Sequence, residues 1–201
     1  MTKSRGTNRR IGSIVLALGC LLVAGATAWS FFGKRTDSLA SITPGETTAS
    51  IDNGEKTLGP SGLPVPRFVS LKAEKVNVRR GPSSDHPVAW VFNRKGMPVE
   101  IVAEFENWRR IRDSDGEEGW ILQNMLAGKR TAVIAPWRQG QTMPLYNQAS
   151  TAGGLVAKVA SGVVSDVESC TGDWCEISAG GYDGWIEQSM LWGVYPGEGV
   201  N

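Results

Sequence analysis

The sequence predicts an all-β protein whose C-terminal two-thirds consist of two small tandem β-barrels. Three observations predict this class. Segments 96–128 and 162–193 carry the same residue types in the same order. Short runs of alternating apolar and polar residues are separated by turns rich in Gly and Pro. No stretch between residues 67 and 201 has the 3.6-residue apolar period of a helix.

The internal repeat is clearest around its tryptophans. Trp108 and Gly119-Trp120-Ile121 in the first copy match Trp174 and Gly184-Trp185-Ile186 in the second, at a spacing of 66 positions before one deletion and 65 after it. A repeat with this period is one structural unit present twice. Each unit has about 60 residues and therefore a marginal core of its own.

Residues 1–32 are predicted to direct the chain out of the cytoplasm. Four bases precede the uncharged run Ile11–Trp29, which is the arrangement of a secretory signal. An A-x-A site ending at Ala28 would permit cleavage. Ile11–Phe32 is also long enough for an uncleaved membrane anchor with a cytoplasmic N-terminus. Both alternatives stay open, whereas lipid attachment at Cys20 is disfavoured because apolar residues follow it.

The predicted localisation follows from either alternative: the repeats are periplasmic or exported, with or without an inner-membrane anchor formed by residues 11–32. Without the four N-terminal bases, the remaining chain has 17 Lys and Arg against 20 Asp and Glu. The mature chain is thus slightly acidic. This balance argues against a nucleic-acid partner, which would select a basic surface.

The organisation after the N-terminal segment is predicted as follows. Residues 33–65 are rich in Ser, Thr, Gly and Pro without an apolar period, which is typical of a disordered linker. Residues 66–128 form the first barrel, residues 129–194 the second, and residues 195–201 a tail.

The strands of the first copy can be predicted one by one from alternation and turn residues. The expected strands cover residues 68–73, 76–79, 89–92, 98–105, 107–112 and 119–122, and residues 123–126 are expected to form a single helical turn.

These residues resemble a known family. Val76-Asn77-Val78-Arg79-Arg80-Gly81-Pro82-Ser83, followed by Trp108-Arg109-Arg110-Ile111-Arg112 and then Gly119-Trp120-Ile121, are similar to a bacterial SH3-like domain (SH3b), in the tandem form found in exported alphaproteobacterial proteins. The resemblance implies an SH3-like barrel with a ligand groove. The second copy departs from the pattern, because Met143-Pro144-Leu145-Tyr146 replaces the Asn-Val-Arg element.

Cys170 and Cys175 are the two cysteines outside the N-terminal segment. Their four-residue spacing would place them opposite each other on a hairpin, and an exported protein favours a disulfide. The rival interpretation is a metal site, which needs further ligands, and the one histidine, His86, lies in the other copy. We therefore predict a disulfide and no metal.

The chain lacks the residues that catalysis requires. One histidine leaves little room for a His-based triad. No glycine-rich phosphate or dinucleotide loop is present, and the paired carboxylates Glu117-Glu118 fall in a predicted exposed turn. The sequence predicts a protein that is not an enzyme and that needs no cofactor.

Binding is the remaining class of function. Strand alternation places Trp108 and Trp120 on the face opposite the core residues Ile111 and Ile121. The candidate ligand groove comprises Arg79, Trp108, Arg110, Trp120 and Met125 in the first copy, and Tyr146, Trp174 and Trp185 in the second. An open alternative is that these tryptophans cover a thin core or seal a contact between the copies.

Three functions are compatible with this face. The first is a non-catalytic envelope module that binds peptidoglycan. The second is an adaptor that binds an extended or Pro-rich peptide of an envelope protein. The third is a spacer of two packed barrels, which predicts that both tryptophan pairs are buried.

Overall fold

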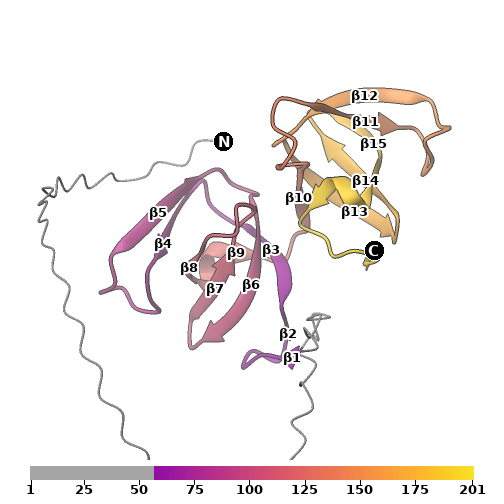
Figure 1. Cartoon of the computed structure of the whole chain (residues 1–201). Helices are drawn as coiled ribbons and strands as arrows, with labels where there is room; N and C mark the ends of the chain where they lie inside the picture. Colours follow the sequence, from indigo (N-terminus) through magenta and orange to yellow (C-terminus); the bar gives the residue numbers. More distant parts are fainter. Residues whose placement is uncertain (1–56) are drawn as a thin grey trace, which may run out of the picture. The chain divides into compact units, whose positions relative to one another are not determined.

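The computed structural model describes residues 57–201 (Figure 1). The predicted signal or anchor, residues 1–32, and most of the predicted linker, residues 33–65, lie outside the described residues. No helix among residues 57–201 is long and apolar enough to cross a membrane.

The first copy of the repeat forms one antiparallel sheet of seven strands. The strands are β3 (Arg67–Leu71), β4 (Lys75–Arg79), β5 (Val88–Asn93), β6 (Pro98–Phe105), β7 (Trp108–Arg112), β8 (Glu118–Leu122) and β9 (Leu126–Ala127). Their order in the sheet is β5-β4-β8-β7-β6-β3-β9. The 3₁₀ turn η1 (Gln123–Met125) precedes β9, and it confirms the single helical turn expected there.

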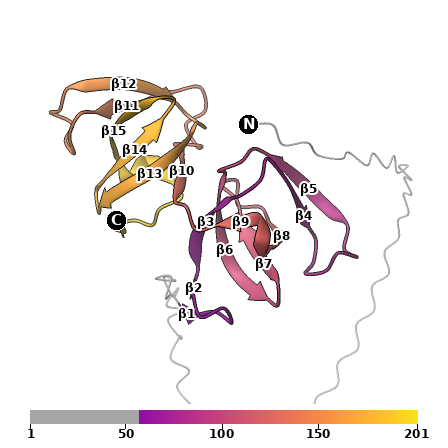
Figure 2. The same ribbon diagram turned by 180° about the vertical axis from the view of Figure 1, so that it is seen from behind.

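The second copy repeats this order. Its strands are β10 (Thr131–Ile134), β11 (Thr142–Tyr146), β12 (Leu155–Ala160), β13 (Val164–Thr171), β14 (Trp174–Ala179), β15 (Tyr182–Glu187), β16 (Leu191–Trp192) and β17 (Gly199–Val200). The order is β12-β11-β15-β14-β13-β10-β16, with β17 added beside β13. In both sheets the first hairpin, β4–β5 or β11–β12, lies at one end (Figure 1; Figure 2).

The predicted all-β class is confirmed, but closed barrels are not observed. Each ladder is open: β5 and β9 end the first sheet without pairing with each other, as do β12 and β16 in the second. The outer strands β9 and β16 are two residues long, so they offer few groups with which to close a barrel by hydrogen bonding.

Alternating residues of each sheet build its core. Val78, Ile111 and Ile121 are fully buried in the first sheet, and their polar neighbours point away, as strand geometry requires. Leu145, Ile177 and other buried residues form a separate cluster in the second sheet. The two copies therefore have a core each.

Two terminal segments differ from the prediction. The end of the predicted linker forms a two-stranded hairpin of β1 (Thr57–Leu58) and β2 (Pro64–Val65), because Ser61 bonds to Glu104 of β6 through its N–H (2.9 Å) and its hydroxyl (2.8 Å). The predicted tail, residues 195–201, contains β17, where Val200 pairs with Cys170 and is 9% exposed.

Candidate ligand-binding faces

Three predicted site residues of the first copy lie in one row across the sheet. Trp120 of β8 is the direct partner of Arg79 of β4 and of Arg110 of β7. Directly opposed residues in an antiparallel sheet point to the same face. The row therefore places the side chain of Trp120 between those of Arg79 and Arg110, on the face opposite Ile111 and Ile121.

Hydrogen bonds orient both arginines of this row. Arg79 donates from Nη1 to the carbonyl of His86 (2.7 Å). Arg110 pairs with Glu118 (2.7 Å), and the Arg110 side chain is 50% exposed. An exposed ion pair contributes about 1 kcal/mol or less. Arg110 can therefore exchange the Glu118 carboxylate for that of a ligand.

A glycine lets each central tryptophan approach its partner strand. A Cβ on Gly119 would overlap the side chain of Val78 and lie 3.1 Å from the carbonyl oxygen of Arg79. A Cβ on Gly184 would lie 2.9 Å from the carbonyl oxygen of Tyr146. The Gly-Trp dipeptide of each copy thus fixes the crossing of two strands as well as the place of the indole.

The structure does not bring Trp108 and Met125 to this surface as predicted. Trp108 is on the face opposite Ile111, but it is only 8% exposed, since its ladder neighbours Phe105 and Leu122 flank it. Met125 is half-buried and packs against the first core. Alternation identifies the face of a strand residue, and neighbouring side chains decide how much of it water reaches.

The three predicted residues of the second copy do meet. Trp185 of β15 is the partner of Tyr146 of β11 and of Glu176 of β14. The ring of Tyr146 contacts that of Trp174 edge-on, with centroids 5.9 Å apart. At matching register positions, the second row therefore has Tyr146 in place of Arg79 and Glu176 in place of Arg110. Its aromatic content is higher and its charge is reversed.

The family of bacterial SH3 domains matches the chain twice, over residues 72–128 and 139–193. The chain belongs to the bacterial SH3 domain family. The comparison with curated proteins found no match.

Two solved structures match parts of the chain at low sequence identity. NlpC2 from Trichomonas vaginalis is 16% identical at a TM-score of 0.29, covering 63% of this chain and 48% of that protein. NlpC1 from the same organism is 17% identical at a TM-score of 0.29, covering 68% of this chain and 48% of that protein. The chain thus spans about half the length of these two structures.

A different cross-link occupies the same hairpin position in the two SH3 domains. Cys170 and Cys175 are partners between β13 and β14, and they form the predicted disulfide. The matching partners in the first SH3 domain are Glu104 and Arg109, whose Oε1 and Nε atoms are 3.2 Å apart. No group of His, Cys, Asp and Glu side chains within residues 57–201 could hold a metal ion.

The Glu104 side chain of the ion pair has further partners besides Arg109. Its side chain is 1% exposed and also pairs with Arg67 (2.7 Å). Burial acts to raise the pKa of Glu104. The hydrogen bonds from the Ser61 N–H, Arg67 and the Ser61 hydroxyl, together with the charge of Arg109, outweigh it and hold the pKa below its ordinary value.

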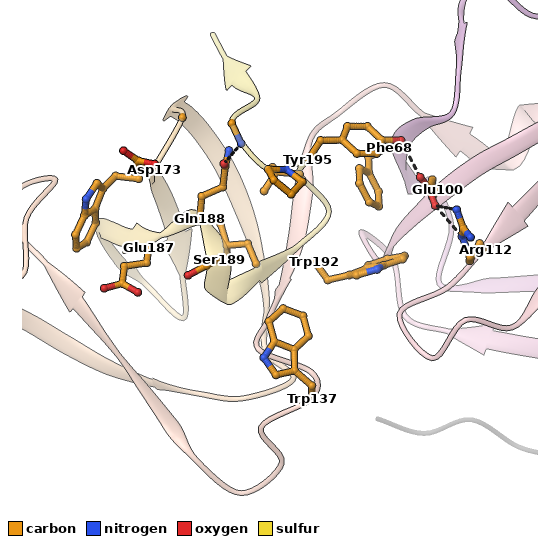
Figure 3. Close-up of a pocket in the computed structure, with 16 residues that line it drawn as sticks. Phe68, Glu100, Arg112, Trp137, Asp173, Glu187, Gln188, Ser189, Trp192 and Tyr195 are labelled. Carbon is orange, nitrogen blue, oxygen red and sulfur yellow. Dashed lines mark hydrogen bonds and ion pairs between the residues drawn. The ribbon is translucent and has the colours of Figure 1, made fainter. Parts of the chain in front are cut away.

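Sequence reasoning missed a pocket of about 820 Å³ that is lined mostly by the second SH3 domain and also by Phe68, Glu100 and Arg112 of the first (Figure 3). Three of its aromatic residues, Trp137, Trp192 and Tyr195, were not among the predicted site residues, whereas Trp174 was. Trp192 contacts Phe68 of the first SH3 domain edge-on, with centroids 5.1 Å apart. The sequence feature that could have indicated this pocket is Trp137, a large aromatic residue in a turn between strands. In the structure its side chain is 55% exposed.

Proposed function

We propose that this protein is a non-catalytic, exported binding module of the cell envelope, and that it binds peptidoglycan on the outer face of its first SH3 domain. The observation that carries the proposal is the row Arg79–Trp120–Arg110, in which Trp120 is the direct ladder partner of both arginines. Membership of the bacterial SH3 domain family and the signal-like N-terminal segment support it.

The indole and guanidinium groups of this row suit the sugar rings and carboxylates of peptidoglycan. A flat indole provides a stacking surface for a sugar ring or a peptide plane. Guanidinium groups bind carboxylates through two parallel hydrogen bonds, and they do so better than ammonium groups. Peptidoglycan stem peptides carry carboxylates along a repeating polymer. Two weak sites on one chain gain affinity on such a polymer through avidity.

The proposed module carries out no reaction. The one histidine, His86, lies in the β4–β5 turn, where its ring fills the space beside Gly81. Its carbonyl supports Arg79. We assign His86 a role in shaping the turn.

A second candidate function is the peptide adaptor, and the edge strand β12 favours it. β12 ends the second sheet and exposes Leu155 (56%) and Val156 (39%). An unpaired edge with apolar side chains can accept an extended peptide as an additional strand. The spacer function is less well supported, because Trp120, Trp174 and Trp185 are half-buried rather than buried.

Co-sedimentation with purified peptidoglycan sacculi tests the proposal. Full-length protein should pellet with sacculi, and Trp120→Ala or Arg110→Gln should reduce the bound fraction at least fivefold. Trp108→Ala is unsuitable because Trp108 is buried. Arg94→Gln is the matched control, since Arg94 is exposed in the β5–β6 turn and should leave binding unchanged.

Circular dichroism of each variant controls for folding. If the unmodified protein stays in the supernatant, the peptidoglycan proposal is wrong. Crosslinking of the full-length protein in cells would then test the adaptor function by identifying a bound envelope protein.

A further inference from the structure

The pocket of about 820 Å³, lined by the second SH3 domain and by Phe68, Glu100 and Arg112 of the first, combines aromatic walls with carboxylates. Trp137, Trp174 and Trp192 line it, together with Asp173 and Glu187 (Figure 3). Its volume of about 820 Å³ lies in the range of sites that hold small ligands. It is separate from the Arg79–Trp120–Arg110 row, none of whose residues line it.

Within the part of the chain that the structure describes, two of the three carboxylates in the pocket have no cationic partner. A third, Glu100, pairs with Arg112 at 2.8 Å and accepts a hydrogen bond from the Tyr195 hydroxyl at 2.9 Å. Among residues 57–201, no ion pair joins a base to Asp173 or Glu187. Figure 3 shows Glu100 with Arg112 at a distance from Asp173 and Glu187. No ion pair among the described residues therefore offsets the negative charge at the Asp173 and Glu187 end of the pocket.

The backbone holds these two carboxylates beside an indole. Glu187 of β15 is the direct ladder partner of Trp174, and Asp173 precedes Trp174 in the turn after β13. The carbonyl of Asp173 accepts a hydrogen bond from the Gln188 N–H (2.8 Å). The disulfide between Cys170 and Cys175 closes the base of the same turn. The backbone that carries Asp173 is thus held by a hydrogen bond and by the disulfide.

Hydrogen bonds from one glutamine fix the opposite wall. The side chain of Gln188 donates to the carbonyl of Glu198 (2.9 Å) and accepts from the Gly197 N–H (2.7 Å). Gln188 is 5% exposed. The segment that carries Tyr195 is therefore tied to the same 3₁₀ turn that follows Glu187.

We propose that this pocket binds the free ammonium group of an amine-bearing peptide. An ammonium ion is attracted both by the carboxylates of Asp173 and Glu187 and by the faces of the surrounding indoles. The apolar stem of such a side chain would lie along Trp137 and Trp192. On the proposed function, which this inference deepens, the amine belongs to the stem peptides of peptidoglycan.

The two SH3 domains would then recognise opposite charges of one polymer. The first has guanidinium groups for carboxylates, and the second has carboxylates for amines.

Nuclear magnetic resonance of the ¹⁵N-labelled full-length protein tests the proposal with Nα-acetyl-L-lysine amide as the probe. The indole N–H signals of Trp137, Trp174 and Trp192 should shift on titration. The signal of Trp90, which is buried in the first core, should stay in place. The Nε-acetylated derivative of the probe, which has no charge, should bind at least tenfold more weakly.

Two charge-neutralising changes test the carboxylates. The Asp173→Asn/Glu187→Gln variant should weaken probe binding at least tenfold, and raised NaCl should weaken it in the unmodified protein. Glu176→Gln is the matched control, because Glu176 is an acid of the same sheet outside the pocket lining, and this change should leave binding unaltered. An unchanged pattern of backbone signals checks the fold.

Three results would overturn the proposal: no movement of the three signals, equal binding of the neutral derivative, or unchanged binding by the double variant. The sacculus experiment separates this outcome from failure of the proposed function. Sacculus binding without probe binding leaves the proposed function and rejects the ammonium site. Probe binding without sacculus binding leaves the ammonium site and rejects peptidoglycan as its source.

Discussion

Glu104 illustrates what a single side chain contributes to the first SH3 domain. Its carboxylate is held by Ser61 from the N-terminal hairpin, by Arg67 from β3 and by Arg109 from β7. These groups come from three separate parts of the chain. A buried carboxylate with several charged partners is costly to replace, since the partners are left uncompensated.

Replacement of Glu104 by Gln should therefore destabilise the protein by about 2–3 kcal/mol at pH 7. The folded-state pKa of Glu104 lies below the ordinary value of 4.5. Its stabilising contribution is thus complete above pH 4.5 and is lost as the pH falls through the folded-state pKa. Urea unfolding at a series of pH values should show a difference between the two proteins that shrinks in acid.

Glu118→Gln is the control for this prediction. Glu118 pairs with the half-exposed Arg110, so its loss should cost about 0.5 kcal/mol. Equal destabilisation by both changes would contradict the role assigned to Glu104.

Trp120 and Trp108 show how far the exposure of single side chains can be predicted from the sequence. Strand alternation and the family resemblance were sufficient to place Trp120, Arg79 and Arg110 in one candidate groove. The burial of Trp108 was not predictable from alternation, because it depends on the side chains of the two neighbouring strands. The role of Glu104 was also hidden, since its partner Ser61 is 43 positions away.

At the scale of elements, the equivalent hairpins β6–β7 and β13–β14 are cross-linked by different kinds of interaction. Both are closed near the turn, one by the Glu104–Arg109 ion pair and the other by the Cys170–Cys175 disulfide. The carbonyl before each tryptophan also accepts the same bond: Gln123 N–H to Asn107 and Gln188 N–H to Asp173, both at 2.8 Å.

Removal of the disulfide by Cys170→Ser/Cys175→Ser should cost about 2 kcal/mol, as expected for so short a loop. Thermal unfolding followed by circular dichroism measures the loss. The double variant should also broaden the indole N–H signal of Trp174. Unchanged stability and an unchanged signal would show that the hydrogen bonds of the hairpin suffice.

The crossing of β4 and β8 depends on Gly119. Gly119→Ala should destabilise the protein by about 2 kcal/mol, because its methyl group would overlap Val78 beside the backbone of Arg79. Gly128→Ala is the control, since a Cβ there meets nothing within 4 Å. Urea unfolding should separate the two variants, and equal stabilities would refute a close crossing.

Most strands of the first SH3 domain were predictable because its alternating runs end at clear turns. The expected strand 98–105 coincides with β6. The β1–β2 hairpin was not predictable, because distant contacts stabilise it rather than a pattern of its own. β17 escaped prediction for the same reason: its two residues pair with β13, far back in the sequence.

At the scale of the whole molecule, three aromatic rings connect the two SH3 domains. Phe68 of β3 contacts Trp192 and Tyr195, with centroids 5.1 and 4.7 Å apart. The Tyr195 hydroxyl donates to Glu100 of β6 (2.9 Å). Burial, and then the charge of Glu100, raises the pKa of Tyr195, so the phenol keeps its proton and remains a donor.

A double-mutant cycle with Tyr195→Phe and Glu100→Gln should therefore give a coupling energy of about 1 kcal/mol. Each single variant and the double variant would be unfolded in urea. A coupling of zero would mean that the hydroxyl and the carboxylate do not interact across the two SH3 domains. The pocket is harder to predict than this contact, because its lining comes from turns and strands spread over both copies.

The two hydrogen bonds that Ser61 donates to Glu104 have a mechanical consequence. A pull on the chain at residue 57 reaches the β1–β2 hairpin before it reaches the sheet, and the hairpin is fastened to β6 by the two bonds from Ser61. The hairpin would yield first, releasing a short length of chain while β3 stays in its ladder.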